Sequence, residues 1–66
     1  MVDTDKLRGV IYERGLTMAK TAAAIGMSQK TFYGKMKSGV FGTDDVDNLI
    51  DVLAITNPAE IFLVKR

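Results

Sequence analysis

The chain has 66 residues, 47% of them hydrophobic and 26% charged, with a formal net charge of +1, which is typical of one globular domain near the lower size limit for a single core. The absence of cysteine excludes disulfides and thiolate metal sites, and the absence of histidine removes the usual zinc ligand and the usual general base. We therefore expect a single domain over residues 1–66 that is no enzyme and uses no metal, cofactor or small-molecule substrate.

Two helices are predicted in the N-terminal part of the chain. The first can be capped by Asp3 or Thr4, and Gly15 ends it at the C′ position, where a left-handed residue is favoured. The second follows the N-cap Thr17 and covers 18–25, where three alanines allow another helix to approach closely. The apolar stripe of the first helix consists of Leu7, Val10 and Ile11.

A third helix is predicted over about 29–37, directly after a short turn that contains Gly26. Ser28 is expected to cap this helix and Gly39 to end it. Two apolar side chains one turn apart form its inward face: Phe32 and Met36.

Two more helices are predicted in the C-terminal part. Thr43 is expected to cap a helix over 44–54, with a buried stripe of Val46, Leu49, Ile50 and Leu53. We interpret the aspartates of its first turn as favourable to the helix dipole and not as metal ligands, because the spacing of a calcium loop is absent. Asn57 is expected to cap a last helix over 58–63, with proline at its first position. The expected fold class is therefore all-α, with five short helices.

The distribution of charged and apolar residues indicates what kind of partner the chain binds. Residues 1–43 carry seven Lys or Arg and three Asp or Glu, which gives +4, whereas residues 44–66 carry two and five, which gives −3. Between Gly15 and Thr43 there are four lysines and no acid, which favours one face that binds a polyanion. No apolar run approaches the ~18 residues that span a bilayer, and a signal-peptide profile is missing. We therefore expect a cytoplasmic protein with no membrane partner.

The stretch from Leu16 to Gly39, LTMAKTAAAIGMSQKTFYGKMKSG, has the order of residues typical of a helix-turn-helix. It resembles the lambda-repressor-like family of helix-turn-helix domains, the Cro and repressor type found in phages and bacteria. The residues that carry this resemblance are Thr17, Ala22, Gly26, Met27, Ser28 and Phe32. The segment 41–63 is similar to the end of small phage regulators, so the resemblance covers nearly the whole chain. Thr21 and Lys35 depart from the family, which usually has apolar residues at these positions.

The resemblance implies that the helix-turn-helix, 17–37, binds double-stranded DNA and that its second helix lies in the major groove. Outward side chains of that helix are then candidates for base contacts, with Gln29 suited to adenine and Lys30 to guanine. Tyr33 can contact a thymine methyl group with its ring or a phosphate with its hydroxyl. The predicted base contacts are Ser28, Gln29, Lys30 and Tyr33.

Contacts to the DNA backbone are expected from lysines and from the start of the second predicted helix, where unpaired N–H groups favour an anion. Such contacts position a protein on DNA without determining sequence. The predicted phosphate contacts are Thr17, Met18, Lys20, Thr31, Gly34, Lys35 and Lys37. Gly34 has two explanations at this level, which are close approach of the backbone to DNA and space for a neighbouring loop.

A single recognition helix rarely gives sufficient specificity, so we expect a homodimer on a pseudo-palindromic operator. The candidate dimer interface is Ile61, Phe62, Leu63 and Val64, and the alternative is that these residues close the core of the monomer. The predicted function is a sequence-specific DNA-binding transcriptional regulator of the phage Cro or repressor type. The alternative function is an antirepressor-like module that keeps the fold but binds a partner repressor, which the weak net charge and the apolar C-terminal end favour.

Overall fold

Five α-helices make up the regular secondary structure of residues 2–63, which are the residues that the computed structural model describes. The all-α, five-helix class predicted from the sequence is therefore confirmed. In chain order the helices are α1 (Thr4–Glu13), α2 (Met18–Ala24), α3 (Gln29–Ser38), α4 (Thr43–Leu53) and α5 (Pro58–Phe62). None of them is long and apolar enough to cross a membrane.

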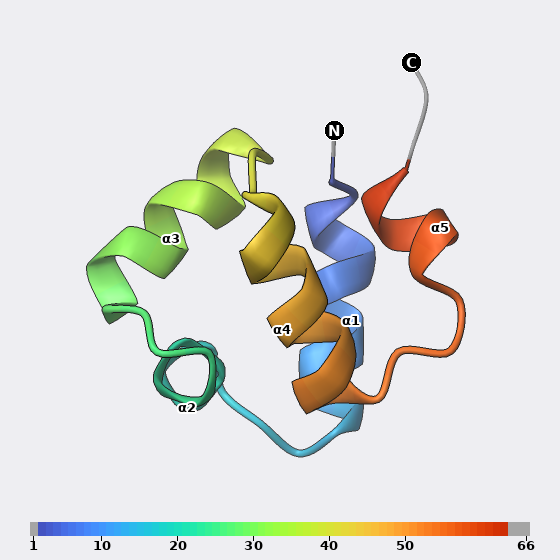
Figure 1. The fold of residues 1–66 in the computed structure, drawn as a ribbon. Helices are drawn as coiled ribbons and strands as arrows, with labels where there is room; N and C mark the ends of the chain where they lie inside the picture. Colours follow the sequence, from blue (N-terminus) through green and yellow to red (C-terminus); the bar gives the residue numbers. More distant parts are fainter. Residues whose placement is uncertain (1, 64–66) are drawn as a thin grey trace.

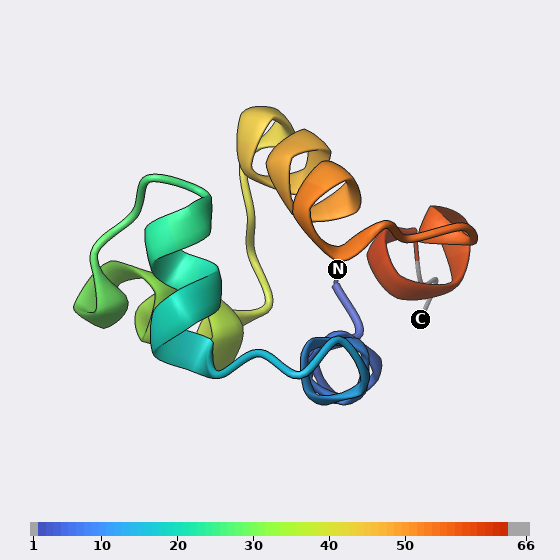
Figure 2. The same cartoon turned by 90° about the horizontal axis from the view of Figure 1, so that it is seen from below.

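The helices lie in three places across the molecule. α2 and α3 lie together on one side of the molecule, α1 and α4 occupy the middle, and α5 lies on the opposite side (Figure 1). The view from below keeps this order, with α2 crossing α3 at one end and α5 at the other (Figure 2). The α2–α3 pair is therefore presented to solvent away from α5.

Side-chain caps begin the first three helices. Asp3, Thr17 and Ser28 each accept a hydrogen bond from the backbone N–H three residues later, at 3.1, 3.1 and 3.2 Å. Asp3, and not Thr4, is therefore the cap of α1. Each such cap stabilises its helix by about 1 kcal/mol. The start of α3 is accordingly determined by residues adjacent to it in the chain.

The start of α4 differs from the prediction. Thr43 is the first helical residue, and Gly42 is the N-cap. The reason is that the Asp45 carboxylate accepts a hydrogen bond from the Gly42 N–H at 3.3 Å, as an acid in the first turn of a helix can do. The ends also differ slightly, because Ala54 has a left-handed backbone (φ +50°) and lies outside α4. Asn57 precedes α5 without a side-chain cap bond.

One apolar core is shared by all five helices. The largest fully buried side chains are Leu7, Ile11, Thr21, Phe32, Leu49 and Leu53. Phe32 of α3 meets Phe41 of the following loop edge to face, with ring centroids 6.1 Å apart. Burial of each large apolar side chain contributes about 1.5–3 kcal/mol, so this core holds α3 firmly by its inner face.

Long-range hydrogen bonds connect segments that lie far apart in the sequence. Arg14 donates from Nε to the Leu53 carbonyl at 2.7 Å and from Nη2 to the Ala54 carbonyl at 3.3 Å. These carbonyls lie at the end of α4, where intrahelical partners are missing. Near the N-terminus, the Val2 N–H donates to the Gly39 carbonyl at 3.1 Å. The end of α3 is thereby attached to the rest of the fold.

Candidate nucleic-acid interface

The turn between α2 and α3 is short and is closed by its own backbone. Gly26 has φ +72°, and its N–H donates to the Ala23 carbonyl at 3.1 Å, while the Met27 N–H donates to the Ala22 carbonyl at 2.9 Å. A side chain at Gly26 would meet open space, so glycine is needed there only for its left-handed backbone. Ala22 is buried between the two helices. These residues set how α3 is oriented relative to α2.

Thr21, one of the two positions that depart from the family pattern, is fully buried in the core. Its hydroxyl donates to the Thr17 carbonyl at 2.9 Å, one turn earlier in α2. The buried hydroxyl is therefore satisfied, and it costs little to place threonine where an apolar residue is expected.

The two faces of α3 have different compositions. Phe32 and Met36 are buried, as predicted for the inward face. The outward face is exposed and consists of Gln29, Lys30, Tyr33, Gly34 and Lys37. This surface carries hydrogen-bonding and cationic groups but no acid. It is the surface that the sequence predicts to enter the major groove.

Ser28 and Thr31 form a closed pair at the start of α3. The Ser28 hydroxyl donates to Thr31 Oγ1 at 2.8 Å and accepts from the Thr31 N–H at 3.2 Å. The single proton of the Ser28 hydroxyl is thereby used within the protein, so the bond to Thr31 Oγ1 competes with donation to a base. Thr31 keeps its own hydroxyl proton, which is free to donate to an outside acceptor.

Gly34 lies in the middle of α3 with nothing near it. A Cβ atom added there would meet no atom within 4 Å, other than its own neighbours and helix backbone. The explanation that glycine makes space for a neighbouring loop is therefore wrong. Glycine costs about 1 kcal/mol against alanine inside a helix, and no packing contact of the described residues accounts for it.

Lys35, the second departure from the family pattern, forms an ion pair between α3 and α4. Its ammonium group lies 3.1 Å from the Asp45 carboxylate, and the two side chains are partly exposed, at 32% and 20%. In the free protein this lysine is therefore already paired, although it was predicted to contact phosphate. Lys20, Lys30 and Lys37 are exposed and form no ion pair within 4.0 Å among the described residues.

The two phosphate contacts predicted at the start of α2, Thr17 and Met18, differ in exposure. Thr17 is exposed, and its hydroxyl oxygen accepts from the Lys20 N–H, which leaves the hydroxyl proton available. Met18 is buried in the core, so only its backbone N–H can face a ligand. The side chain of Met18 thus serves packing.

Two of the four residues of the predicted dimer interface belong to the monomer core. Ile61 is 5% exposed and Phe62 8% exposed, so these two side chains are not available to a second chain. The alternative, closure of the core, is correct for them, because α5 packs its apolar side against the rest of the fold. Leu63 is 73% exposed, and Val64 lies outside the described residues.

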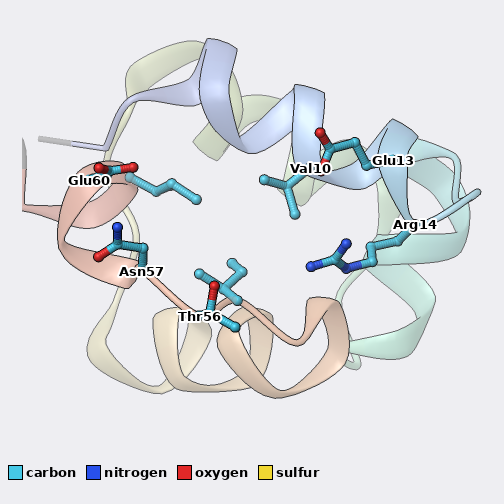
Figure 3. A pocket seen from close by; sticks show the side chains of 8 residues that line it. Val10, Glu13, Arg14, Thr56, Asn57 and Glu60 are labelled. Atoms are coloured by element: carbon cyan, nitrogen blue, oxygen red, sulfur yellow. The ribbon is translucent and has the colours of Figure 1, made fainter.

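Two surface pockets lie away from the outer face of α3. One, of about 170 Å³, lies between α1, the α4–α5 loop and α5, and no sequence motif indicated it. Figure 3 shows Glu13 and Glu60 on different sides of this pocket and Arg14 at its edge. A second pocket, of about 210 Å³, is lined by Val2, Gly39, Val40, Phe41, Val46 and Phe62. No three acidic side chains of the described residues come together as a metal site in either place.

Comparison with known proteins adds no relative. No protein-family model, no curated protein and no solved structure matches the chain. The resemblance to the lambda-repressor-like family therefore stays a prediction based on the residues of 16–39. Function has to be inferred from the chain's own residues and their geometry.

Proposed function

We propose that this chain is a sequence-specific, double-stranded DNA-binding transcriptional regulator of the Cro or repressor type, which acts in the cytoplasm and places α3 in the major groove. The observation that supports this proposal best is the division of α3 into two faces. Its inner face is fixed in the core by Phe32 and Met36, and its outer face is exposed, polar and without acids. An α-helix of this kind fits the width of the major groove.

Base contacts are assigned to the N-terminal half of α3. Gln29 presents an amide that suits adenine, and Lys30 presents an unpaired ammonium group that suits guanine O6 and N7. Each good base contact discriminates by about 1–3 kcal/mol. Ser28 takes part mainly as the cap that keeps this half of the helix in place.

Phosphate contacts are assigned to lysines that form no ion pair among the described residues and to hydroxyl groups that have a proton to donate. Lys20 and Lys37 supply charge, and the hydroxyls of Thr17 and Thr31 each have a proton to donate. Every phosphate neutralised by a lysine steepens the salt dependence of binding, with a slope of roughly −0.9 per phosphate. Lys35 makes no such contact unless it leaves Asp45.

Gly34 is assigned to the close approach of the α3 backbone to DNA. The space outside its Cα atom is open in the free protein, and Lys30 and Lys37 lie one turn before and after it on the helix. A methyl group at this position would occupy space that a sugar or phosphate takes in the complex. The cost of glycine to the helix is then offset by binding.

The test compares two glycines that have similar surroundings but lie on different helices. Gly34 of α3 and Gly9 of α1 are both exposed, both helical and both without neighbours within 4 Å. We expect Gly34→Ala and Gly9→Ala each to raise the free energy of unfolding by up to about 1 kcal/mol. Only Gly34→Ala is expected to weaken DNA binding, by about tenfold or more.

Unfolding is measured by chemical denaturation, and DNA binding by mobility shift on sites selected from a random pool by the unmodified protein. Equal affinity of Gly34→Ala and Gly9→Ala for a selected site would contradict the close approach. Failure of the unmodified protein to enrich any sequence, or equal binding of selected and random DNA, would contradict the proposed function itself.

We further propose a homodimer on DNA, with half-sites about 34 Å apart. We assign it to Leu63 and Val40, which are the most exposed of the large hydrophobic residues described, since Ile61 and Phe62 are in the core. Sedimentation of the protein alone and with a selected site tests this assignment. A single protomer bound to the site would contradict it.

A second candidate function, an antirepressor-like interaction module, is favoured by one observation. Val40 is 66% exposed beside the apolar second pocket, on the loop between α3 and α4. A protein partner could cover this surface without contacting DNA. The module is supported if the chain binds no DNA at low salt and co-elutes with a purified repressor, and it is contradicted by sequence-specific DNA binding.

A further inference from the structure

Two exposed side chains of α3 contact each other across one helical turn. The Gln29 amide nitrogen, Nε2, donates a hydrogen bond to the Tyr33 hydroxyl oxygen at 3.5 Å. Both residues are exposed on the outer face, and Tyr33 is 46% exposed. A bond of this length is weak, so it favours one orientation of the amide without locking it.

This orientation changes what the amide can offer to a base. A glutamine amide has two N–H donors and one carbonyl acceptor. When one N–H faces Tyr33, one donor and one acceptor remain for an outside partner. In the major groove, adenine presents one acceptor, N7, and one donor, the N6 amino group, which match this pair of groups.

Guanine presents a different hydrogen-bonding pattern in the major groove. It presents two acceptors, O6 and N7, and a glutamine can satisfy both only by directing both N–H groups at the base. That arrangement requires the hydrogen bond between Gln29 and the Tyr33 hydroxyl to break. The contact between the two side chains thus favours binding of the Gln29 amide to adenine and disfavours its binding to guanine.

We propose that Tyr33 is a positioning residue that orients the Gln29 amide, so that the pair selects adenine over guanine at one base pair of the operator. This inference rests on the proposed function, because it requires that α3 enters the major groove. It also assigns the Tyr33 hydroxyl to Gln29, in place of the phosphate contact that the sequence left open. The ring of Tyr33 remains free to contact a thymine methyl group.

The test is Tyr33→Phe, which removes the hydroxyl and keeps the ring. The base pair that depends on Gln29 is found first, as the position of the selected site at which Gln29→Ala abolishes preference. Affinity is then measured for the site with adenine and with guanine at that position. We expect Tyr33→Phe to lower the adenine-to-guanine preference by about three- to tenfold, the range that one modest hydrogen bond allows.

Two readouts separate this role from others. In the Gln29→Ala background, Tyr33→Phe should have no further effect on the preference, because the two residues act through one contact. Tyr12→Phe is the matched control, since Tyr12 is exposed on α1 at 64% and lies outside α2 and α3. It should leave affinity and preference unchanged.

Three outcomes would overturn the inference. An unchanged preference in Tyr33→Phe, with sequence-specific binding retained, refutes the positioning role and leaves the proposed function intact. An equal loss of affinity for both sites assigns the Tyr33 hydroxyl to the DNA backbone. Equal binding of selected and random DNA by the unmodified protein removes the proposed function, and this inference with it.

Discussion

The half of the molecule that contains α2 and α3 is organised by near neighbours, whereas the half that contains α4 and α5 depends on distant ones. Thr17 and Ser28 cap their own helices. In the other half, Arg14, which directly follows α1, caps the end of α4, and α5 begins without a side-chain cap bond. The comparison shows that the starts of α2 and α3, the proposed recognition unit, are determined by residues adjacent in the sequence. The half that contains α4 and α5 depends instead on contacts between distant residues.

The largest expected effect tests the dependence of α4 on a distant residue. Arg14→Ala removes two hydrogen bonds from a charged donor to carbonyls at the end of α4, so we expect a loss of about 2 kcal/mol in the free energy of unfolding. Arg8→Ala, within α1, is the control, because Arg8 only faces the exposed Asp5 at 3.9 Å. Chemical denaturation measures both, and equal losses would mean that α4 does not need Arg14.

The next effect compares Ser28, whose hydroxyl caps α3, with Thr43, whose hydroxyl does not cap α4. Ser28→Ala should lower the free energy of unfolding by about 1 kcal/mol, because the Thr31 N–H loses its partner. Thr43→Ala should change it by less than about 0.5 kcal/mol, since Gly42 is the N-cap of α4. Thermal unfolding distinguishes the two variants, and a larger loss in Thr43→Ala would restore Thr43 as a cap.

The smallest effect on stability separates two lysines of α3. Lys35→Met should change the free energy of unfolding by about 0.5 kcal/mol or less, because the ion pair with Asp45 is modest. It should leave the salt slope of DNA binding unchanged. Lys37→Met should lower the magnitude of that slope by about 0.9, as expected for one lost phosphate contact. Mobility shifts at several salt concentrations measure the slopes, and a reversed order would reassign the phosphate contact to Lys35.

Features set by adjacent residues could be predicted from the sequence. Thr17 and Ser28 are caps, and Gly15, Gly26 and Gly39 have positive φ, because hydroxyl acceptors and left-handed glycines act within a few residues. The contact of Gln29 with Tyr33 could also have been found, since residues four apart in a helix are neighbours.

Features that depend on how helices meet could not be predicted in the same way. Whether Ile61 and Phe62 face the core or a partner is decided by the position of α5. The pairing of Lys35 with Asp45 requires that α3 and α4 lie side by side. At Gly42 two local signals competed, and the acid in the first turn of α4 prevailed over the threonine hydroxyl.

The hydrogen bond from the Asp3 N–H to the Ile61 carbonyl, at 2.7 Å, has a consequence for the order of folding. It joins the two ends of the described chain and closes a longer loop than any other hydrogen bond of the described residues, and each doubling of loop length adds about 0.6 kcal/mol to the entropy cost of closure. Contacts between α2 and α3 close much shorter loops, so we expect them to form earlier. In native-state hydrogen exchange, the Asp3 amide should open with a lower free energy than the amides of α3 beside Phe32. The pair of α2 and α3 would then persist while the contact between Asp3 and Ile61 opens and closes.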